Sequence, residues 1–375
     1  MDRYDVIIVG GGLAGLTSAI HLSKRGYKVA VFEKQSYPNH KVCGEYVSNE
    51  INPYLESLGI TLVQAGAVAI TEFVFSTRKG ESCKTKLPIG GMGISRFALD
   101  DLLYKKAKSQ KVIFHFQKVV SVVYKDDDFT VITATKELYN SKIVIGAYGK
   151  RSILDKFLNR DFSFARNSWM AVKAHYKNTT FPNNIVALHS FNGGYGGLSK
   201  TETGAVNFCY LTNYKSFQNH NSISDFNKKV VGQNPYLNDF LSRSEPIFNN
   251  PLTIAQISFQ KKAPVVDHVL MCGDTAGLIH PLCGNGMAMA IHSAKIGSEL
   301  IIKYFGDNNY DRNKLEKEYL SKWNSAFRTR LWAGRRLQSL LLHEGLLDIG
   351  VKTIGRSDRI LRFLIAKTHG KPIIC

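Results

Sequence analysis

Hydrophobic residues near the start of the chain follow a strand–helix–strand pattern. Val6–Val9 is a continuous run of β-branched residues, which is typical of a strand buried on both faces. Apolar residues at Leu13, Leu16 and Ile20 then take a helical spacing, and Lys28–Phe32 is a second strand-like run. This order predicts a parallel α/β unit.

Later stretches alternate between apolar and polar residues. The alternation is clear in Ala67–Phe75, Ser168–Tyr176 and Ala205–Tyr210. A period of two is typical of antiparallel strands with one buried face. After about Asp311 the apolar positions take a helical spacing among many basic residues. The pattern predicts an α/β fold in which an antiparallel sheet is inserted into a Rossmann-like unit and a helical C-terminal region follows.

A glycine-rich turn stands between the first predicted strand and the helix. Gly10, Gly12 and Gly15 have the spacing G-x-G-x-x-G, and Glu33 follows the second strand. In a dinucleotide-binding unit these glycines permit a tight turn, a close approach to the pyrophosphate and close packing of the helix. Glu33 would accept hydrogen bonds from ribose hydroxyls and would repel a 2′-phosphate. The unit alone fits NAD or FAD, and it is not suited to NADP.

A second segment far along the chain decides between these cofactors. Residues 272–287 read CGDTAGLIHPLCGNGM. A strand is predicted to end at Gly273–Asp274, where the carboxylate of Asp274 would bind a ribityl hydroxyl. Pro281, Gly284 and Gly286 would begin a helix whose free N–H groups face an electron-rich ring carbonyl. Together with the Gly10 turn, this segment predicts bound FAD.

The inserted sheet divides the chain into separate segments. We predict that residues 1–49, 95–158 and 265–305 form a discontinuous FAD-binding domain. Residues 50–94 and 159–264 would form a substrate domain, whose sheet covers the flavin because pockets favour domain junctions. Residues 306–375 would form a basic helical C-terminal region.

The bulk composition limits the classes of partner. The chain has 375 residues and a formal net charge of +19, which favours anionic partners such as phosphate-bearing cofactors, acidic carrier proteins or anionic lipid. Nucleic acid is disfavoured because no zinc-finger spacing or RNP motif is present. The six cysteines form no CxxC pair and the eleven histidines no HxxxH pair, so we expect a reduced cytoplasmic protein without a metal site. No apolar stretch approaches the ~20 residues of a membrane-spanning helix.

These motifs, with three others, make the chain resemble the geranylgeranyl reductase family of FAD-dependent reductases. That family lies within the flavoprotein monooxygenase-like (p-hydroxybenzoate hydroxylase-type) superfamily, whose cofactor domain is of the glutathione-reductase type. The other motifs are Lys41–Glu45 with its K-x-C-G pattern, Ile94–Asp100 with its arginine, and Gly146–Ser152. The resemblance spans nearly the whole chain. It implies FAD contacts at Ala14, Glu33, Cys43, Gly44, Tyr46, Arg96, Val120, Asp274, Gly286 and Met287.

Two of the predicted positions admit a purely structural interpretation. Arg96 could place its guanidinium on a phosphate, or it could face solvent at the start of a helix. Gly197 stands where the family often has tryptophan in a substrate-side segment, which would leave room for a bulkier substrate. The surrounding glycines could equally form a bent strand or a hairpin. Tyr148 replaces the usual aspartate of its motif, so docking of NAD(P)H as electron donor is in doubt.

The resemblance implies reduction of a carbon–carbon double bond in an isoprenoid or other lipid-like substrate, with hydride from the flavin and a proton from a nearby acid. Cys43 and Tyr195 are the candidate catalytic residues. Two alternatives stay open: oxygen-dependent hydroxylation of a lipidic or phenolic substrate, and electron transfer to a protein or quinone. The basic C-terminal helices could bind an anionic membrane, as at the inner membrane surface, or an acidic carrier. They could also bury their apolar stripe against the same chain.

Overall fold

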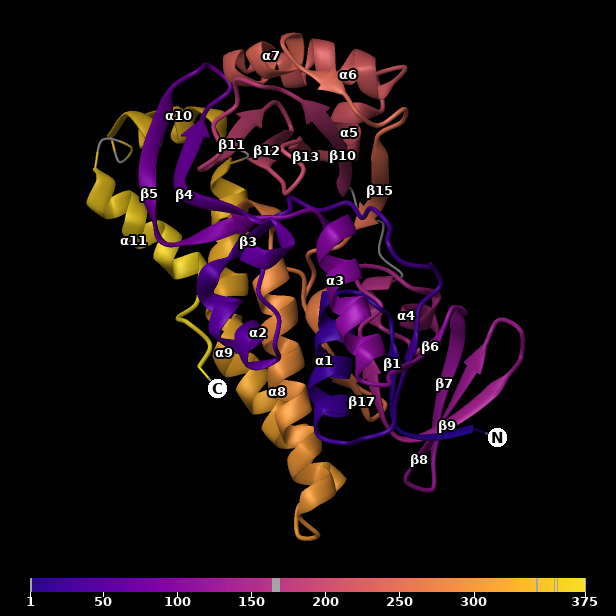
Figure 1. The fold of residues 1–375 in the computed structure, drawn as a ribbon. Coiled ribbons are helices and arrows are strands. Elements are labelled where there is room, and N and C mark those ends of the chain that lie inside the picture. Colours follow the sequence, from indigo (N-terminus) through magenta and orange to yellow (C-terminus); the bar gives the residue numbers. More distant parts are fainter. Residues whose placement is uncertain (1, 164–168, 342, 354, 356, 375) are drawn as a thin grey trace.

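The computed structural model describes residues 2–163, 169–341, 343–353, 355 and 357–374, and it contains two sheets with helices around them (Figure 1). The first sheet has the spatial order β16 (Val265–Val266), β17 (Val269–Met271), β9 (Leu138–Gly146), β1 (Asp2–Val9), β2 (Val29–Phe32) and β6 (Ile113–His115). Strands β17, β9, β1, β2 and β6 are parallel. The strands β7 (Val119–Lys125) and β8 (Asp128–Thr133) form an antiparallel meander with β9.

The first sheet is buried as its apolar strands predict. Val6, Ile7 and Ile8 of β1 are fully buried, because α1 (Leu13–Lys24) and its neighbours pack against the sheet. Helix α1 contacts both α3 (Arg96–Ser109) and α8 (Gly286–Gly306). The predicted strand–helix–strand unit is therefore present.

The second sheet is almost wholly antiparallel. Its order is β14 (Glu245–Pro246), β10 (Trp169–Lys177), β13 (Val206–Asn213), β12 (Gly194–Lys200), β11 (Ile185–Phe191), β4 (Val68–Ser76), β5 (Ser82–Gly93) and β3 (Tyr46–Ser48), and β15 (Leu252–Ile257) also pairs with β10. The pair β4–β11 is parallel, and it joins the two inserted segments, which are far apart in the sequence. On one face, Phe226, Leu237 and Phe240 pack against Val172 and Phe208 of the strands.

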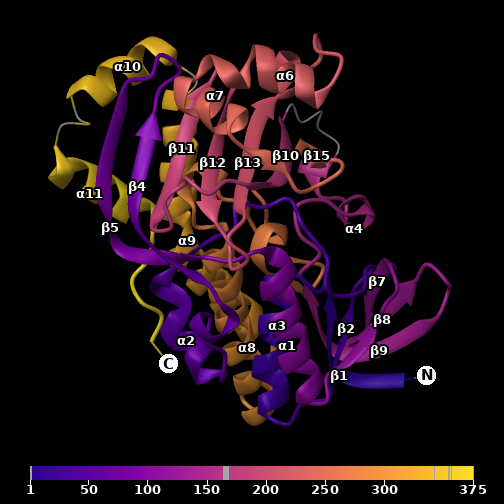
Figure 2. The ribbon, with the colours of Figure 1, turned by 45° about the horizontal axis from the view of Figure 1, so that its top comes forward.

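The remaining elements are short helices and the C-terminal helices. The short helices are α2 (Asn52–Ser57), α4 (Ile153–Phe157), α5 (Tyr214–Phe217), α6 (Ile223–Lys229) and α7 (Pro235–Ser242). Single 3₁₀ turns are η1 (Asn49–Ile51), η2 (Val63–Ala65), η3 (Asp161–Ser163), η4 (Val231–Gln233), η5 (Gly273–Thr275) and η6 (Pro281–Cys283). Helices α6 and α7 cover the outer face of the second sheet, as both views show (Figure 2).

The C-terminal region is helical, as predicted. Helix α9 (Arg312–Leu341) packs along α8, and α10 (Glu344–Thr353) and α11 (Asp358–Thr368) reach β5 of the second sheet (Figure 1). Tyr319 of α9 is fully buried and its hydroxyl donates to the carbonyl of Met271 at 2.6 Å. The apolar stripe is thus partly used within the chain. Within the described part of the chain, no helix combines the length and apolar character needed to cross a bilayer.

The fold class is confirmed, but two predicted boundaries differ. Strand β17 ends at Met271 and not at Gly273–Asp274, because Gly273 has a φ of +62° and begins a 3₁₀ turn. Strand β3 lies inside the predicted segment 1–49 yet pairs with β5 of the second sheet. The alternating strand predicted from Ser168 begins at Trp169, and Ser168 itself lies outside the described residues.

Candidate functional site

One large cavity lies where the two sheets meet. Residues that directly follow β1, β9 and β17 line it, among them Gly12, Ala147 and Asp274. The carboxyl ends of parallel strands are the usual place for a cofactor in an open α/β sheet. The opposite wall comes from strands of the second sheet, so the cavity lies at the predicted junction between cofactor and substrate segments.

Two of the glycines at the start of α1 and just before it lie in close contact with backbone. Gly10 has a φ of +108°, and a side chain there would meet the Ala147 carbonyl at 2.4 Å. A side chain at Gly15 would lie 2.0 Å from the carbonyl of Gly10. At Gly12 an added Cβ would meet only the Arg96 Nη2, at 3.7 Å. Gly10 and Gly15 thus shape the turn, and Gly12 opens it toward the cavity.

Arg96 faces inward, so the solvent-facing interpretation is wrong. It is the first residue of α3, whose cap Ser95 accepts from Ala98 N–H at 3.0 Å. Its guanidinium makes two bonds to the buried Asp100, at 2.7 and 2.8 Å, and Lys41 Nζ lies 2.9 Å from the same carboxylate. Two cations therefore share one anion beside Gly12. The surplus positive charge suits a phosphate.

Two buried cations, Lys262 and Arg160, bind the backbone of the Asp274 turn, and no sequence motif indicated either residue. Lys262 Nζ donates to the Asp274 carbonyl at 2.9 Å, and Arg160 Nη2 donates to the Thr275 carbonyl at 2.8 Å. Burial lowers the pKa of Lys262 to about 8, although the charge of Asp274 opposes that shift. Asp274 itself lines the cavity.

Tyr148 lies behind this turn, outside the cavity lining. Its hydroxyl accepts from Arg160 Nη1 at 3.2 Å, and the same nitrogen donates to Asp155 at 3.0 Å. Burial, reinforced by the charge of Asp155, raises the pKa of Tyr148 well above its usual value. In this chain Asp155 therefore provides the carboxylate that neutralises Arg160.

Helix α8 begins at the cavity without a side-chain cap. Gly284 has a φ of +61° and connects the 3₁₀ turn η6 to Gly286, the first residue of α8. The first turn of α8 holds no acidic residue, and an added Cβ at Gly286 would meet only Ile279, at 3.6 Å. The free N–H groups and the positive end of the helix dipole are therefore accessible from the cavity.

Glycine residues leave the backbone accessible in the lining of the cavity. Added Cβ atoms at Gly44 and Gly149 would meet no atom of the protein within 4 Å, and both residues line the cavity with Gly12 and Gly286. Helix α1 likewise starts without a side-chain cap. Two uncapped helix N-termini and a basic pair fit an anionic dinucleotide that carries a polar ring edge, as FAD does.

Most predicted cofactor residues line this cavity. They are Gly12, Ala14, Cys43, Gly44, Tyr46, Arg96, Asp274, Pro281, Gly284, Gly286 and Met287. Gly10, Gly15, Glu33 and Val120 are not among the lining residues. Glu33 accepts from Gly11 N–H at 2.9 Å, and the Tyr37 hydroxyl donates to the Gly11 carbonyl at 2.6 Å, beside the turn. Val120 lies half-buried in β7.

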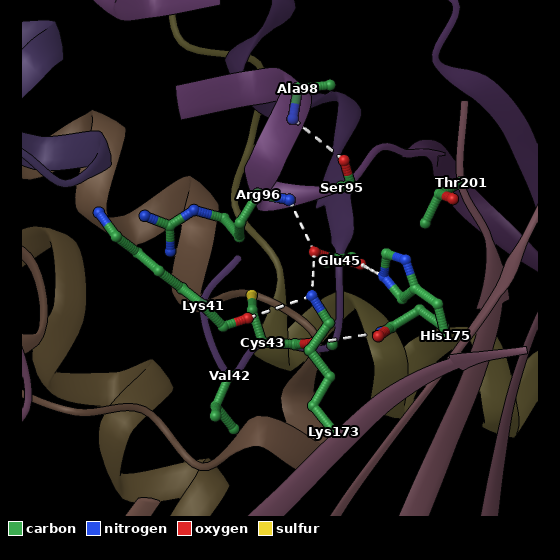
Figure 3. Close-up of polar contacts among 12 residues, drawn as sticks. Lys41, Val42, Cys43, Glu45, Ser95, Arg96, Ala98, Lys173, His175 and Thr201 are labelled. Atoms are coloured by element: carbon green, nitrogen blue, oxygen red, sulfur yellow. Dashed lines mark hydrogen bonds and ion pairs between the residues drawn. The ribbon is translucent and has the colours of Figure 1, made fainter. Parts of the chain in front are cut away.

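A buried ionic cluster centred on Glu45 supports the Cys43–Gly44 loop (Figure 3). Glu45 has a φ of +55° and no exposed surface. Its carboxylate accepts from Lys173 Nζ at 2.5 Å, from His175 Nε2 at 2.6 Å and from Arg96 N–H at 2.7 Å. Burial works to raise the pKa of Glu45, but the His175 hydrogen bond and the charge of Lys173 outweigh it and lower the pKa.

The second sheet also binds the carbonyl groups of this loop. Lys173 Nζ donates to the Lys41 carbonyl at 3.2 Å, and Asn207 Nδ2 donates to the Cys43 carbonyl at 3.1 Å. These donors come from β10 and β13. The loop that carries Cys43 is therefore positioned by the sheet behind it.

The same cluster brings potential metal ligands together, whereas the sequence predicted no metal site. His40, Glu45 and His175 offer one ligand atom each, all within 4.8 Å of one another. Lys173 already neutralises Glu45, so a divalent cation would face an ammonium group with no second carboxylate in the triad. The geometry describes an ion-pair cluster.

The two candidate catalytic residues both line the cavity. The Tyr195 hydroxyl accepts from Leu282 N–H at 2.9 Å and lies 2.8 Å from His280 Nδ1. Burial raises the pKa of Tyr195 and lowers the pKa of His280 to about 3. Tyr195 thus holds the segment before α8. Cys43 is half-buried, and the described cysteines are all free.

The wall opposite the glycines is apolar. It is lined by Phe73, Leu87, Ala171, Val186, Leu188, Leu198, Leu211, Ile257 and Ile365. Gly197 lies in this wall within the hairpin β11–β12, so the segment is both a hairpin and part of the cavity. A Cβ at Gly197 would meet nothing nearer than 3.8 Å.

Comparisons with known proteins agree with this fold. Residues 5–44 match a family model described as FAD dependent oxidoreductase. The chain is 24% identical to a digeranylgeranylglycerophospholipid reductase of Methanococcus vannielii, over 86% of this chain and 82% of the relative. It is also 24% identical to a 1H-pyrrole-2-carbonyl-[peptidyl-carrier protein] chlorinase of Pseudomonas fluorescens, over 83% of this chain and 78% of the relative.

A solved structure with the same fold is a geranylgeranyl bacteriochlorophyll reductase-like protein from Thermoplasma acidophilum. It superposes with a TM-score of 0.78 at 19% identity and covers 98% of this chain and 96% of its own. The family match and the flavoprotein fold confirm the prediction of FAD as cofactor.

Proposed function

We propose that this chain, a FAD-dependent oxidoreductase, reduces a carbon–carbon double bond in an isoprenoid or other lipid-like substrate. The observation that carries the proposal is the composition of the cavity. Its glycine-lined backbone side opens directly onto a wall of aliphatic and aromatic side chains. An apolar wall of this size favours a long hydrocarbon substrate over a small polar one.

The residues of the cavity have distinct parts in binding FAD. Gly12 and Arg96 would hold the pyrophosphate, Asp274 a ribityl hydroxyl, and the start of α8 the carbonyl edge of the ring. Bound FAD supplies the hydride that a double-bond reduction requires. The positive end of the α8 dipole would stabilise negative charge at that ring edge. We further propose NAD(P)H as the donor that restores the reduced cofactor.

The reduction also needs a proton, and we assign it to Cys43. Its side chain lines the cavity on a loop fixed by Lys173 and Asn207. Tyr195 is the less suitable donor because its hydroxyl is engaged by Leu282 and His280. A thiol in the cavity would serve as the general acid that protonates the substrate carbon next to the one that receives the hydride.

The experiment is anaerobic turnover of an isoprenoid lipid by the FAD-loaded, chemically reduced protein. We expect a product that is heavier by the mass of two hydrogens, and a rate reduced at least tenfold in Cys43→Ser. Cys83→Ser is the matched control, because Cys83 lies on β5 outside the cavity lining. Turnover that requires oxygen, with labelled oxygen entering the product, would instead identify a hydroxylase and overturn the proposal.

A further inference from the structure

Helix α11 has two different apolar faces. Its inner residue Ile365 lines the cavity together with Thr368 and with His369, which follows the helix. Its outer residues Ile360, Phe363 and Leu364 are 44%, 59% and 38% exposed. A spacing of three and four residues places the outer residues on one side of the helix. One helix therefore separates the cavity from an exposed apolar surface.

Basic residues surround this outer face. Arg359, Arg362 and Lys367 are exposed, and Lys367 Nζ lies 4.9 Å from the centre of the Phe363 ring. The acidic residue Asp358 is engaged by Arg362 and by the Thr85 hydroxyl. Aromatic and aliphatic residues flanked by cations are the combination that inserts into an anionic lipid surface.

Helix α9, which contacts α11, carries a similar stripe. Trp332 and Leu340 are exposed, and Arg336 lies over the Trp332 ring at 5.6 Å. An exposed apolar residue such as Val123, which is 44% exposed on the strand β7, belongs to no such helical stripe. Single exposed apolar residues are ordinary on a protein surface, whereas a grouped set indicates a binding surface.

The chain after α11 is attached to the body of the protein. Gly370 N–H donates to the Glu50 carboxylate, which also pairs with Arg330 Nη1 at 2.9 Å. Ile373 N–H donates to the Glu50 carbonyl at 2.8 Å. These bonds fix the end of α11 beside the cavity, so its outer face has a defined orientation.

We propose that the outer face of α11 docks on an anionic lipid bilayer and that substrate passes from the bilayer beside this helix into the cavity. The charge of the face and the net charge of +19 favour an anionic surface. The apolar residues favour a bilayer over a purely polar polyanion. This inference rests on the proposed function only in taking the substrate to be lipid-like; the docking itself does not depend on the reaction.

Cosedimentation of the FAD-loaded protein with vesicles tests the docking. We expect binding to vesicles of phosphatidylcholine with phosphatidylglycerol, weaker binding at high salt, and little binding to phosphatidylcholine alone. Phe363→Glu should lower the bound fraction at least fivefold, and a double variant with Arg359→Glu and Lys367→Glu should do the same. Val123→Glu, on the strand β7 and outside both helices, should bind as the unmodified protein does. FAD content and melting temperature establish that each variant is folded.

The proposal is overturned if Phe363→Glu and Val123→Glu bind anionic vesicles equally. It is also overturned if Phe363 matters only for binding to an acidic carrier protein and not to vesicles. Turnover of a detergent-dispersed substrate separates this inference from the proposed function, because Phe363→Glu should leave that rate unchanged. Vesicle binding that depends on Phe363, in a protein that reduces no alkene, would leave the docking intact and refute the reaction.

Discussion

The two walls of the cavity are built from different parts of the chain. The cofactor wall consists mainly of backbone at the ends of strands and the beginnings of helices, where Gly12, Gly44, Gly149 and Gly286 expose their N–H and C=O groups. The substrate wall consists of side chains that project from the second sheet and α11. A backbone wall recognises the polar groups common to one cofactor. A side-chain wall can change with the substrate while the fold stays the same.

Because the cofactor wall is closely packed backbone, a side chain added to its glycine turn should reduce FAD binding and stability more than the other changes below. In Gly15→Val the new Cβ would lie 2.0 Å from the Gly10 carbonyl, which is fixed backbone. We expect loss of FAD binding and a free energy of unfolding lower by about 3 kcal/mol. Flavin absorbance of the purified protein and denaturant unfolding measure both. Gly306→Ala is the control, because no atom lies within 4 Å of its added Cβ. Equal FAD content in the two variants would show that the turn is not closely packed.

The cofactor wall could be predicted from the sequence because its requirements are local. Gly10 and Gly284 adopt a positive φ, which favours glycine at a turn, and Gly15 lies against the carbonyl of the nearby Gly10. Lys173 and Glu45 lie 128 positions apart in the sequence, so only the pairing of the strands brings them together. No sequence motif around Arg160 indicates its role either, although its guanidinium donates to the Thr275 carbonyl.

The substrate wall could be predicted only in part, because its arrangement also depends on contacts between distant segments. The alternating pattern predicted β4, β10 and β13, but the other strands, their order and the parallel pair β4–β11 could not be deduced from it. The contribution of α11 to the cavity was missed as well. Its apolar residues were seen as one stripe, whereas Ile365 faces the cavity and Phe363 faces solvent.

Glu45 belongs to both walls, since it lines the cavity and is bound by the second sheet. Glu45→Gln would leave the fully buried Lys173 without its counter-charge. We expect the free energy of unfolding to fall by about 3 kcal/mol. Glu72→Gln is the control, because its partner Lys84 is exposed and such a pair contributes below about 1 kcal/mol.

The pH dependence of this effect follows from the lowered pKa of Glu45. A carboxyl group with a lowered pKa in the folded state stabilises the protein above its unfolded pKa. That stabilisation is lost as pH falls through the folded pKa. The difference in unfolding free energy between the original protein and Glu45→Gln should therefore be largest above about pH 5 and should shrink below the unfolded pKa of ~4.3. A difference that grows on acidification would contradict the assigned charges.

Gly197→Leu tests the substrate wall without touching the cofactor wall. The new side chain would enter open space, because the nearest atoms to its Cβ lie at 3.8 Å. We expect normal FAD content and a KM for a bulky isoprenoid that rises about tenfold, which corresponds to ~1.4 kcal/mol of binding. The KM for a shorter alkene should rise less. Loss of FAD instead would mean that this wall also forms the cofactor site.

Tyr195→Phe removes a single hydroxyl group. It tests the contact between Tyr195 on the substrate wall and the segment before α8 on the cofactor wall. The hydroxyl accepts from Leu282 N–H, so its removal leaves a buried donor unpaired beside the start of α8. We expect a free energy of unfolding lower by ~1–2 kcal/mol. Reduction of the alkene should persist at a similar rate, because Cys43 supplies the proton in the proposed mechanism. If the stability changes little but the reaction stops, Tyr195 is the proton donor, and the substrate wall then takes part in the chemistry as well as in binding.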